Sequence, residues 1–130
     1  MLLNNLYTIQ SLSENGRIIR ATALLQADHA IFKGHFPGQP VLPGVCMLEM
    51  ITEITRSQLN QKFRITAAPL IKFLNMIDPG KDPLIEFEIK YAHTADKLIL
   101  AGSIHSGPRI FMKFQMTLEP VGTTGFPAMG

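Results

Sequence analysis

Residues 84–119 alternate between apolar and polar side chains in separate short segments, and this alternation restricts the possible folds more than any other feature. A period of two residues is typical of a β-strand with one buried face. A third apolar segment, KLILAGSIH (97–105), lies between the two alternating ones, and short turns such as Ser106-Gly107-Pro108 connect them. The three segments therefore predict an antiparallel meander. The expected inward side chains are Ile85, Phe87, Ile89 and Tyr91 in segment 84–91, and Ile110, Met112, Phe114, Met116 and Leu118 in segment 110–119.

Further strands are expected earlier in the chain. Segments LYTIQSL (6–12) and RIIRATALL (17–25) flank Asn15-Gly16. Asn and Gly both tolerate positive φ, so this pair predicts a two-residue hairpin turn. Segment APLIKFLNMI (68–77) is expected to form another strand, which the turn-rich DPGKDP (78–83) would end.

One helix is expected, from near Pro43 to about Leu59. The fixed φ of proline suits a first helical turn. Apolar residues cover most of the circumference, and such a helix is enclosed by other structure. We therefore expect an α+β fold in which an antiparallel sheet of about five or six strands wraps one long central helix. The edges of such a sheet need covering, which favours a dimer.

Length and composition narrow the remaining possibilities. The chain has 130 residues, of which 46% are hydrophobic, and we expect one domain over residues 1–119 with a flexible tail over 120–130. The net charge of +2 and the lack of any Lys/Arg run argue against a nucleic-acid partner. The single cysteine allows no intrachain disulfide, and the sequence shows neither a secretory signal nor a membrane span. We expect a cytoplasmic protein.

The segment GHFPGQPVLPGVCMLEM (34–50) holds the residues most suited to chemistry. His35 lies in a loop that prolines stiffen, and a rigid loop can hold a base within hydrogen-bond reach of a substrate. Pro43-Gly44 begins the expected helix, whose first N–H groups could polarise a carbonyl oxygen. Glu49 lies among apolar neighbours, where a carboxyl group would keep the proton that a general acid needs. The alternatives are an ordinary polar loop residue for His35 and a solvent-facing carboxylate for Glu49.

This segment closely resembles the active-site motif of the 3-hydroxyacyl-(acyl carrier protein) dehydratases of the FabZ/FabA type, which have a hotdog fold. The motif reads G-H-F-P-G-x-P-x-x-P-G-V-x-x-x-E, and GHFPGQPVLPGVCMLE matches it in register over residues 34–49. KFLNMIDPG, with Lys72, Phe73, Pro79 and Gly80, looks like the second signature of that family. The resemblance covers roughly residues 6–119.

The resemblance implies dehydration of a (3R)-3-hydroxyacyl thioester, carried on acyl carrier protein, to a trans-2-enoyl thioester. His35 and Glu49 would be the catalytic acid–base pair, with Glu49 supplied by the other subunit of a homodimer, and which of them performs which step stays open. The Gly44 N–H would hold the thioester carbonyl, and the Val45 carbonyl would orient His35. Phe36 and Pro43 are assigned to substrate binding with them. The resemblance implies no metal and no organic cofactor, and assembly beyond the dimer stays open.

The helix departs from the family pattern directly after the motif. The family continues Glu-Ala-x-Ala-Gln, whereas this chain has Met50, Thr52 and Glu53 at the last three named positions. Glu53 thus places a second carboxylate one turn from Glu49. These changes bear on tunnel width and rate more than on reaction type.

Competing functions remain open. A hotdog thioesterase would use Glu49 to activate water but typically lacks the G-H-F-P-G loop. A MaoC-type hydratase needs a tighter Asp-x4-His spacing than Asp28 and His35 offer. A non-catalytic acyl-binding module is the remaining alternative.

Cys46 is expected to be a packing residue, and three methionines are candidates to line an acyl tunnel: Met47, Met50 and Met76. Six basic residues could attract an acidic carrier protein: Lys33, Arg56, Lys62, Arg64, Lys72 and Lys81.

Overall fold

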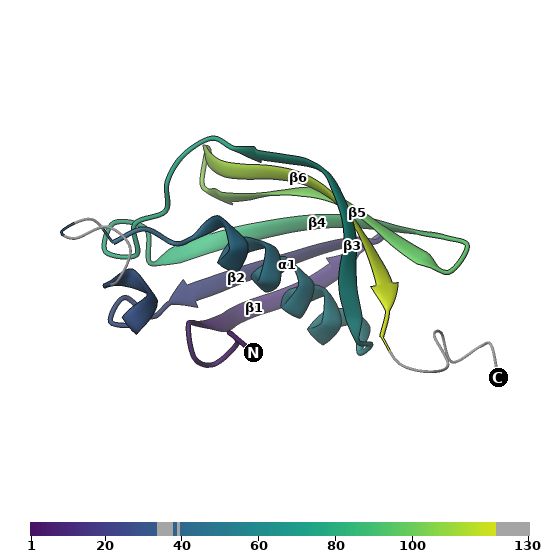
Figure 1. Ribbon diagram of the computed structural model, residues 1–130, viewed down its shortest axis with the longest axis horizontal. Helices are drawn as coiled ribbons and strands as arrows, with labels where there is room; N and C mark the ends of the chain where they lie inside the picture. Colours follow the sequence, from purple (N-terminus) through teal and green to yellow (C-terminus); the bar gives the residue numbers. More distant parts are fainter. Residues whose placement is uncertain (34–37, 39, 122–130) are drawn as a thin grey trace.

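A computed structural model describes residues 1–33, 38 and 40–121 of the chain. The described part contains one α-helix and one six-stranded antiparallel sheet, in agreement with the α+β prediction (Figure 1). The elements in chain order are β1 (Tyr7–Asn15), β2 (Ile18–Leu25), the short 3-10 helix η1 (Ala30–Phe32), α1 (Gly44–Leu59), β3 (Phe63–Phe73), β4 (Leu84–Thr94), β5 (Lys97–Ser106) and β6 (Arg109–Pro120). The spatial strand order is β1-β2-β4-β5-β6-β3, so β3 lies at the edge furthest from β1.

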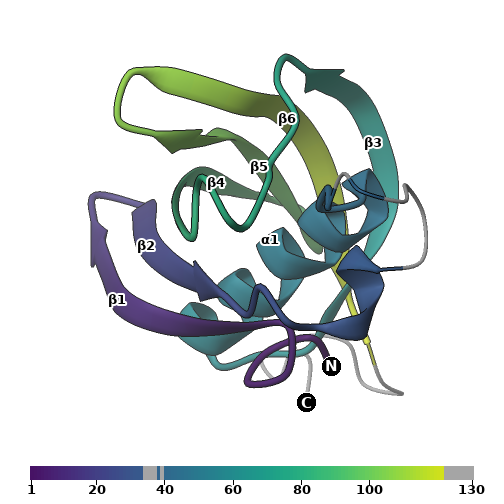
Figure 2. The same cartoon turned by 90° about the vertical axis from the view of Figure 1, so that its left-hand side faces the viewer.

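The sheet curls around α1, which Figure 2 shows end-on at the centre of the curve. The inward residues of the helix and of all six strands form one apolar core, in which Met50, Ile51 and Ile54 are fully buried. The helix has 16 residues, roughly 24 Å, so it is of ordinary length and the expectation of a long helix is not confirmed. Val45 is 73% exposed, so α1 is also not enclosed on every side by this one chain.

The first hairpin forms as predicted, but its turn lies one residue later. Asn15 pairs with Ile18 in the β1–β2 ladder, and positive φ occurs at Gly16 (59°) and Arg17 (63°). Asn15 is therefore the last strand residue, and Gly16-Arg17 are the two central turn residues. A turn with positive φ at both central positions matches the right-handed twist of the strands that it joins.

Strands β4, β5 and β6 form the predicted meander, and Ile85, Phe87 and Ile89 face the core. The prediction for Ile110 is wrong. The β5–β6 register shifts where Ile104 opposes Met112 and His105 opposes Ile110, which leaves Phe111 as an extra residue. Because a bulge reverses the alternation, Phe111 and Met112 are both buried, while Ile110 lies on the outer face beside Lys113.

The prediction for residues 68–77 is wrong at both ends, since β3 spans Phe63–Phe73. The N–H groups of Leu74 and Asn75 both donate to the carbonyl of Phe111, which draws the segment after Phe73 out of the ladder. Pro69 interrupts β3 near a register shift, and a proline without an N–H is tolerated at a sheet edge. Within the described ranges, no helix has the length and apolar character needed to cross a membrane.

Candidate active site

Helix α1 begins with amide groups that its own turns cannot satisfy. Pro43 is the N-cap, with φ −63° and ψ 146°, and offers no side-chain acceptor. The N–H groups of Cys46 and Met47 donate to the Pro43 carbonyl at 3.0 and 3.3 Å. The N–H groups of Gly44 and Val45 come earlier in the first turn and have no acceptor within the helix. They lie at the positive end of the helix dipole, which favours a negatively charged oxygen.

Gly44 lies directly against the ring of Phe73 at the end of β3. A Cβ atom on Gly44 would be 2.6 Å from Cζ of Phe73, closer than carbon atoms pack. A residue with a side chain therefore does not fit here unless the ring moves. This contact joins the Pro43-Gly44 motif to the second signature, which contains Phe73 and lies about thirty residues later in the chain.

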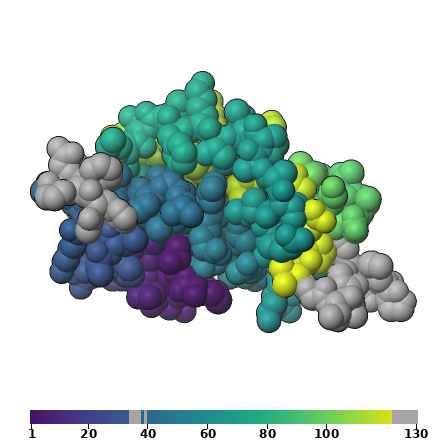
Figure 3. All heavy atoms as spheres, viewed as in Figure 1, coloured from purple at the N-terminus to yellow at the C-terminus, as the bar shows by residue number. Residues whose placement is uncertain are grey.

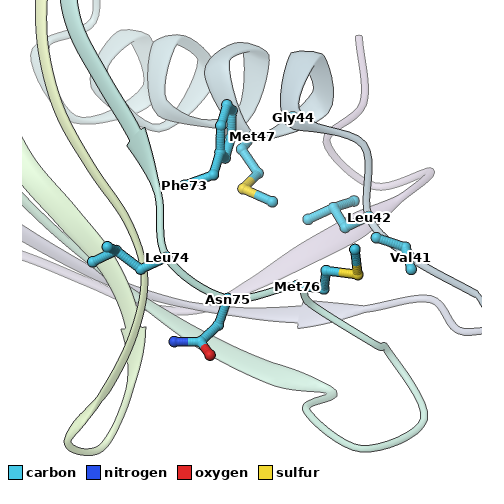
Figure 4. A pocket seen from close by; sticks show the side chains of 8 residues that line it. All are labelled: Val41, Leu42, Gly44, Met47, Phe73, Leu74, Asn75 and Met76. Carbon is cyan, nitrogen blue, oxygen red and sulfur yellow. The ribbon is translucent and has the colours of Figure 1, made fainter.

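A pocket of about 390 Å³ opens beside this contact (Figure 4). Met47, Leu42 and Met76 point toward a shared space from α1, from the loop before it and from the segment after β3. The Leu42 N–H donates to the Ile77 carbonyl at 2.9 Å, which ties the two loops together. The described lining is mostly apolar and consists of Val41, Leu42, Gly44, Met47, Phe73, Leu74, Asn75 and Met76.

Glu49 lies in a different hollow, on the side of α1 that faces the start of the chain. Its side chain is 40% exposed, and its Oε1 is 3.8 Å from Nη1 of Arg56. Arg56 is itself fixed, because its Nε and Nη2 donate to the Phe63 carbonyl at 3.0 and 2.6 Å. Glu49 is therefore partly buried in the single chain, between the two alternatives that the sequence leaves open. The hollow has a volume of about 410 Å³ and is lined by Met1, Leu2, Glu49, Glu53 and Arg56.

Glu53 is fully buried, and three donors from the first seven residues of the chain reach its carboxylate. The N–H groups of Leu2 and Leu3 donate to Oε2 and Oε1, each at 2.8 Å, and the Tyr7 hydroxyl donates to Oε1 at 3.0 Å. Burial and the neighbouring carboxylate raise the pKa of Tyr7, so its hydroxyl stays a donor. The sequence indicates a second charge near Glu49, but this anchoring role is not visible in it.

A family model described as "ApeI dehydratase" matches residues 10–107, a span that contains the helix start, the pocket and Glu49. The chain belongs to the ApeI-like dehydratase family. It is also 29% identical to the 3-hydroxyacyl-[acyl-carrier-protein] dehydratase FabZ of Photorhabdus laumondii over 84 residues, which are 58% of this chain and 56% of that protein. A stretch of 42 residues is 45% identical to FabZ of Klebsiella pneumoniae, covering 32% and 28% of the two chains. The chain thus matches little more than half the length of the first of these curated relatives and less than a third of the second.

Solved structures support the hotdog fold for this ApeI-like chain. The dehydratase heterocomplex ApeI:P from Xenorhabdus doucetiae is similar with a TM-score of 0.69 and 16% identity, over 86% of this chain and 96% of that one. A hypothetical thioesterase with coenzyme A from Streptococcus pneumoniae is similar with a TM-score of 0.62 and 12% identity, over 90% and 87%. At such identities the likeness concerns the fold alone.

The other predicted site residues of this ApeI-like chain divide into three groups. His35 and Phe36 lie outside the described residues, so the expected contact between His35 and the Val45 carbonyl stays a prediction. Met47 and Met76 line the pocket as suggested, whereas Met50 lies in the core.

Cys46 is buried, and burial raises the pKa of its thiol, which fits a packing role. Four pocket residues had no role assigned from the sequence: Val41, Leu42, Leu74 and Asn75. Phe73 was marked only as part of the second signature.

Proposed function

We propose that this protein dehydrates (3R)-3-hydroxyacyl thioesters, carried on acyl carrier protein, to trans-2-enoyl thioesters. The observation that carries the proposal is the pocket at the start of α1, where Gly44 in the first helical turn joins a mostly apolar lining. An apolar pocket with a few convergent polar groups suits an acyl thioester. Membership of a dehydratase family and the likeness to FabZ support this choice of reaction.

The chemistry assigns distinct tasks to the groups. Removal of the C2 proton generates negative charge on the thioester carbonyl oxygen, which the Gly44 N–H would stabilise. One member of the pair His35 and Glu49 takes the C2 proton. The other protonates the departing hydroxyl, so that it leaves as water. The Val45 carbonyl would hold the His35 ring in the productive orientation.

We further propose that two subunits complete each site. Gly44 and Glu49 lie on the same helix, yet they line separate hollows, so Glu49 would serve the pocket of a neighbouring subunit. Apolar side chains are exposed around the pocket and the β3 edge, and the largest exposed fractions are those of Val45, Met76 and Phe73. A homodimer would cover them. The Xenorhabdus relative is a heterocomplex, which makes a second hotdog chain the alternative partner.

The test follows hydration, the reverse reaction. Purified protein receives a trans-2-enoyl thioester on acyl carrier protein and, separately, on coenzyme A, and loss of the conjugated enoyl absorbance is recorded. We expect hydration of the carrier-linked substrate, and we expect His35→Ala and Glu49→Gln each to abolish it. Glu88→Gln is the matched control and should keep full activity, because it only removes a charge on β4 that pairs with Arg20 of β2.

Subunit mixing tests the shared site. If His35 and Glu49 act from different subunits, mixing the two inactive variants should restore about a quarter of the activity, because half of the randomly formed dimers contain one intact site. No recovery in verified mixed dimers would refute the shared site. Release of free thiol without hydration would indicate a thioesterase, and binding without either signal would indicate an acyl-binding module.

A further inference from the structure

The hydrogen bonds of Glu53 all come from donors. They are the amides of Leu2 and Leu3 and the hydroxyl of Tyr7. An ionised carboxylate only accepts, so this set fits the charged form. A buried charge is retained only where hydrogen bonds or counter-charges compensate for lost water, and these three donors supply that compensation.

An amide in place of this carboxylate would not fit the same donors. The dehydratases that the chain resembles have glutamine at this position. A glutamine here could accept from Leu3 and Tyr7 through its oxygen, but its NH₂ group would then face the N–H of Leu2. Two donors cannot bond to each other. Glutamate is therefore specifically suited to holding residues 2 and 3 in this place.

The residues that Glu53 anchors lie next to Glu49. Residues 1–3 lie beside α1, because the Leu2 and Leu3 amides donate to Glu53 and Met1 lines a hollow with Glu49. In the space-filling view the purple N-terminal segment adjoins the blue atoms of the helix (Figure 3). Met1 and Leu2 form the apolar part of the hollow whose polar part is Glu49, Glu53 and Arg56. Leu2 is half-buried and packs against the core. The wall next to Glu49 thus lies outside the helix and the strands, and Glu53 holds it through the amides of Leu2 and Leu3. A turn also contributes, since the Leu2 carbonyl accepts from the N–H groups of Asn5 and Leu6, and Leu3 forms a bridge with Tyr7.

We propose that Glu53 is a positioning residue that fixes residues 1–3 as a wall beside Glu49, and that Leu2 in this wall limits the size of the acyl group accepted there. This inference rests on the proposed dehydration, in which Glu49 is part of the site. Without the hydrogen bonds to Glu53, residues 1–3 can move away from Glu49. The kcat/KM for longer acyl chains then rises relative to that for shorter ones.

The test combines two measurements on Glu53→Gln and on the matched control Thr55→Val. Thr55 is also buried in α1, but its hydroxyl bonds only within the helix, to the Ile51 carbonyl. Hydrogen exchange at the Leu2 and Leu3 amides should accelerate at least about tenfold in Glu53→Gln and stay unchanged in the control. The ratio of kcat/KM for a dodec-2-enoyl over a crotonyl carrier thioester should rise at least about fivefold in Glu53→Gln only.

Leu2→Ala keeps the proposal testable if Glu53→Gln does not fold. It should raise the same ratio, and the double variant should raise it no further, because both changes act through one wall. Two results would overturn the role of Glu53. One is faster exchange at the Leu2 and Leu3 amides with an unchanged kcat/KM ratio in an active enzyme. The other is additive effects on this ratio in the double variant. Absence of hydration by the unaltered protein would instead overturn the proposed function and this inference together.

Discussion

Replacing Gly44 with alanine would put a methyl group where the Phe73 ring now lies. The new Cβ would be 2.6 Å from Cζ of Phe73 and 3.0 Å from Cε1, so the ring must move. Phe73 is 54% exposed and can swing toward solvent. The overpacking cost should therefore be about 1 kcal/mol, at the low end of the usual range. Alanine recovers about 0.5–1 kcal/mol relative to glycine within a helix.

These opposing effects predict a variant that is folded but impaired. The free energy of unfolding of Gly44→Ala should change by less than about 1 kcal/mol, and the melting temperature by less than about 4 °C. Displacement of the ring opens the pocket and shifts the amide that would polarise the carbonyl. Misplacement on this scale should lower kcat/KM for enoyl hydration by about tenfold or more.

Phe73→Leu provides the matched rescue, since leucine lacks the Cε and Cζ atoms that meet the new methyl group. Gly44→Ala combined with Phe73→Leu should recover most of the activity lost in Gly44→Ala. The two changes should then be strongly non-additive, as expected for residues in contact. Full activity in Gly44→Ala, or no rescue in the double variant, would refute the reasoning that this contact shapes the site.

Two further predictions concern the core and the anchor. A Cβ on Gly102 would lie 1.8 Å from the Glu88 carbonyl oxygen, a backbone atom that cannot yield, so Gly102→Ala should lower the free energy of unfolding by about 3 kcal/mol or more in urea titrations. Gly107→Ala, with φ 56° and open space around it, is the control and should cost about 1 kcal/mol. Burial and Glu53 raise the pKa of Tyr7, so above pH about 10 the unfolded chain releases a proton that the folded protein keeps. The Tyr7 contribution is complete below that pH and declines above it by up to about 1.4 kcal/mol per pH unit, and Tyr7→Phe should show a flatter decline between pH 9.5 and 11. An equal slope in both proteins would contradict this.

The alternation of apolar and polar residues was sufficient to predict most strands of the sheet, because it shows directly which face of a strand is buried. Ile85, Phe87 and Ile89 illustrate this. The bulge at Phe111 could not be predicted in the same way, because one inserted residue leaves the composition of the segment unchanged while reversing the faces on one side of it. The end of β3 was missed for a related reason. Residues 74–77 are mostly apolar and resemble a strand, but the N–H groups of Leu74 and Asn75 donate to the Phe111 carbonyl instead of continuing the ladder.

The candidate site was predictable where chemistry depends on a compact motif. Pro43-Gly44 marked the helix start, and the structure places that start against Phe73, which the second signature contained. Glu53 was different. Its partners lie 46 to 51 residues away in the chain, so no local pattern connects them. Only the general rule that buried carboxylates need partners could have prompted a search for them.

The position of β3 in the sheet has a consequence for synthesis on the ribosome. Its sole neighbour in the described sheet is β6, the last of the described strands to be made, and Phe63 pairs with Pro120. While β4 and β5 emerge, the nascent chain holds α1 and an unpaired β3 whose partner does not yet exist. Exposed apolar surface and open strand edges are the features that make such intermediates aggregate. Translation of the final strand therefore closes the sheet over the helix, and a ribosome stalled before β6 leaves β3 without its pairing partner.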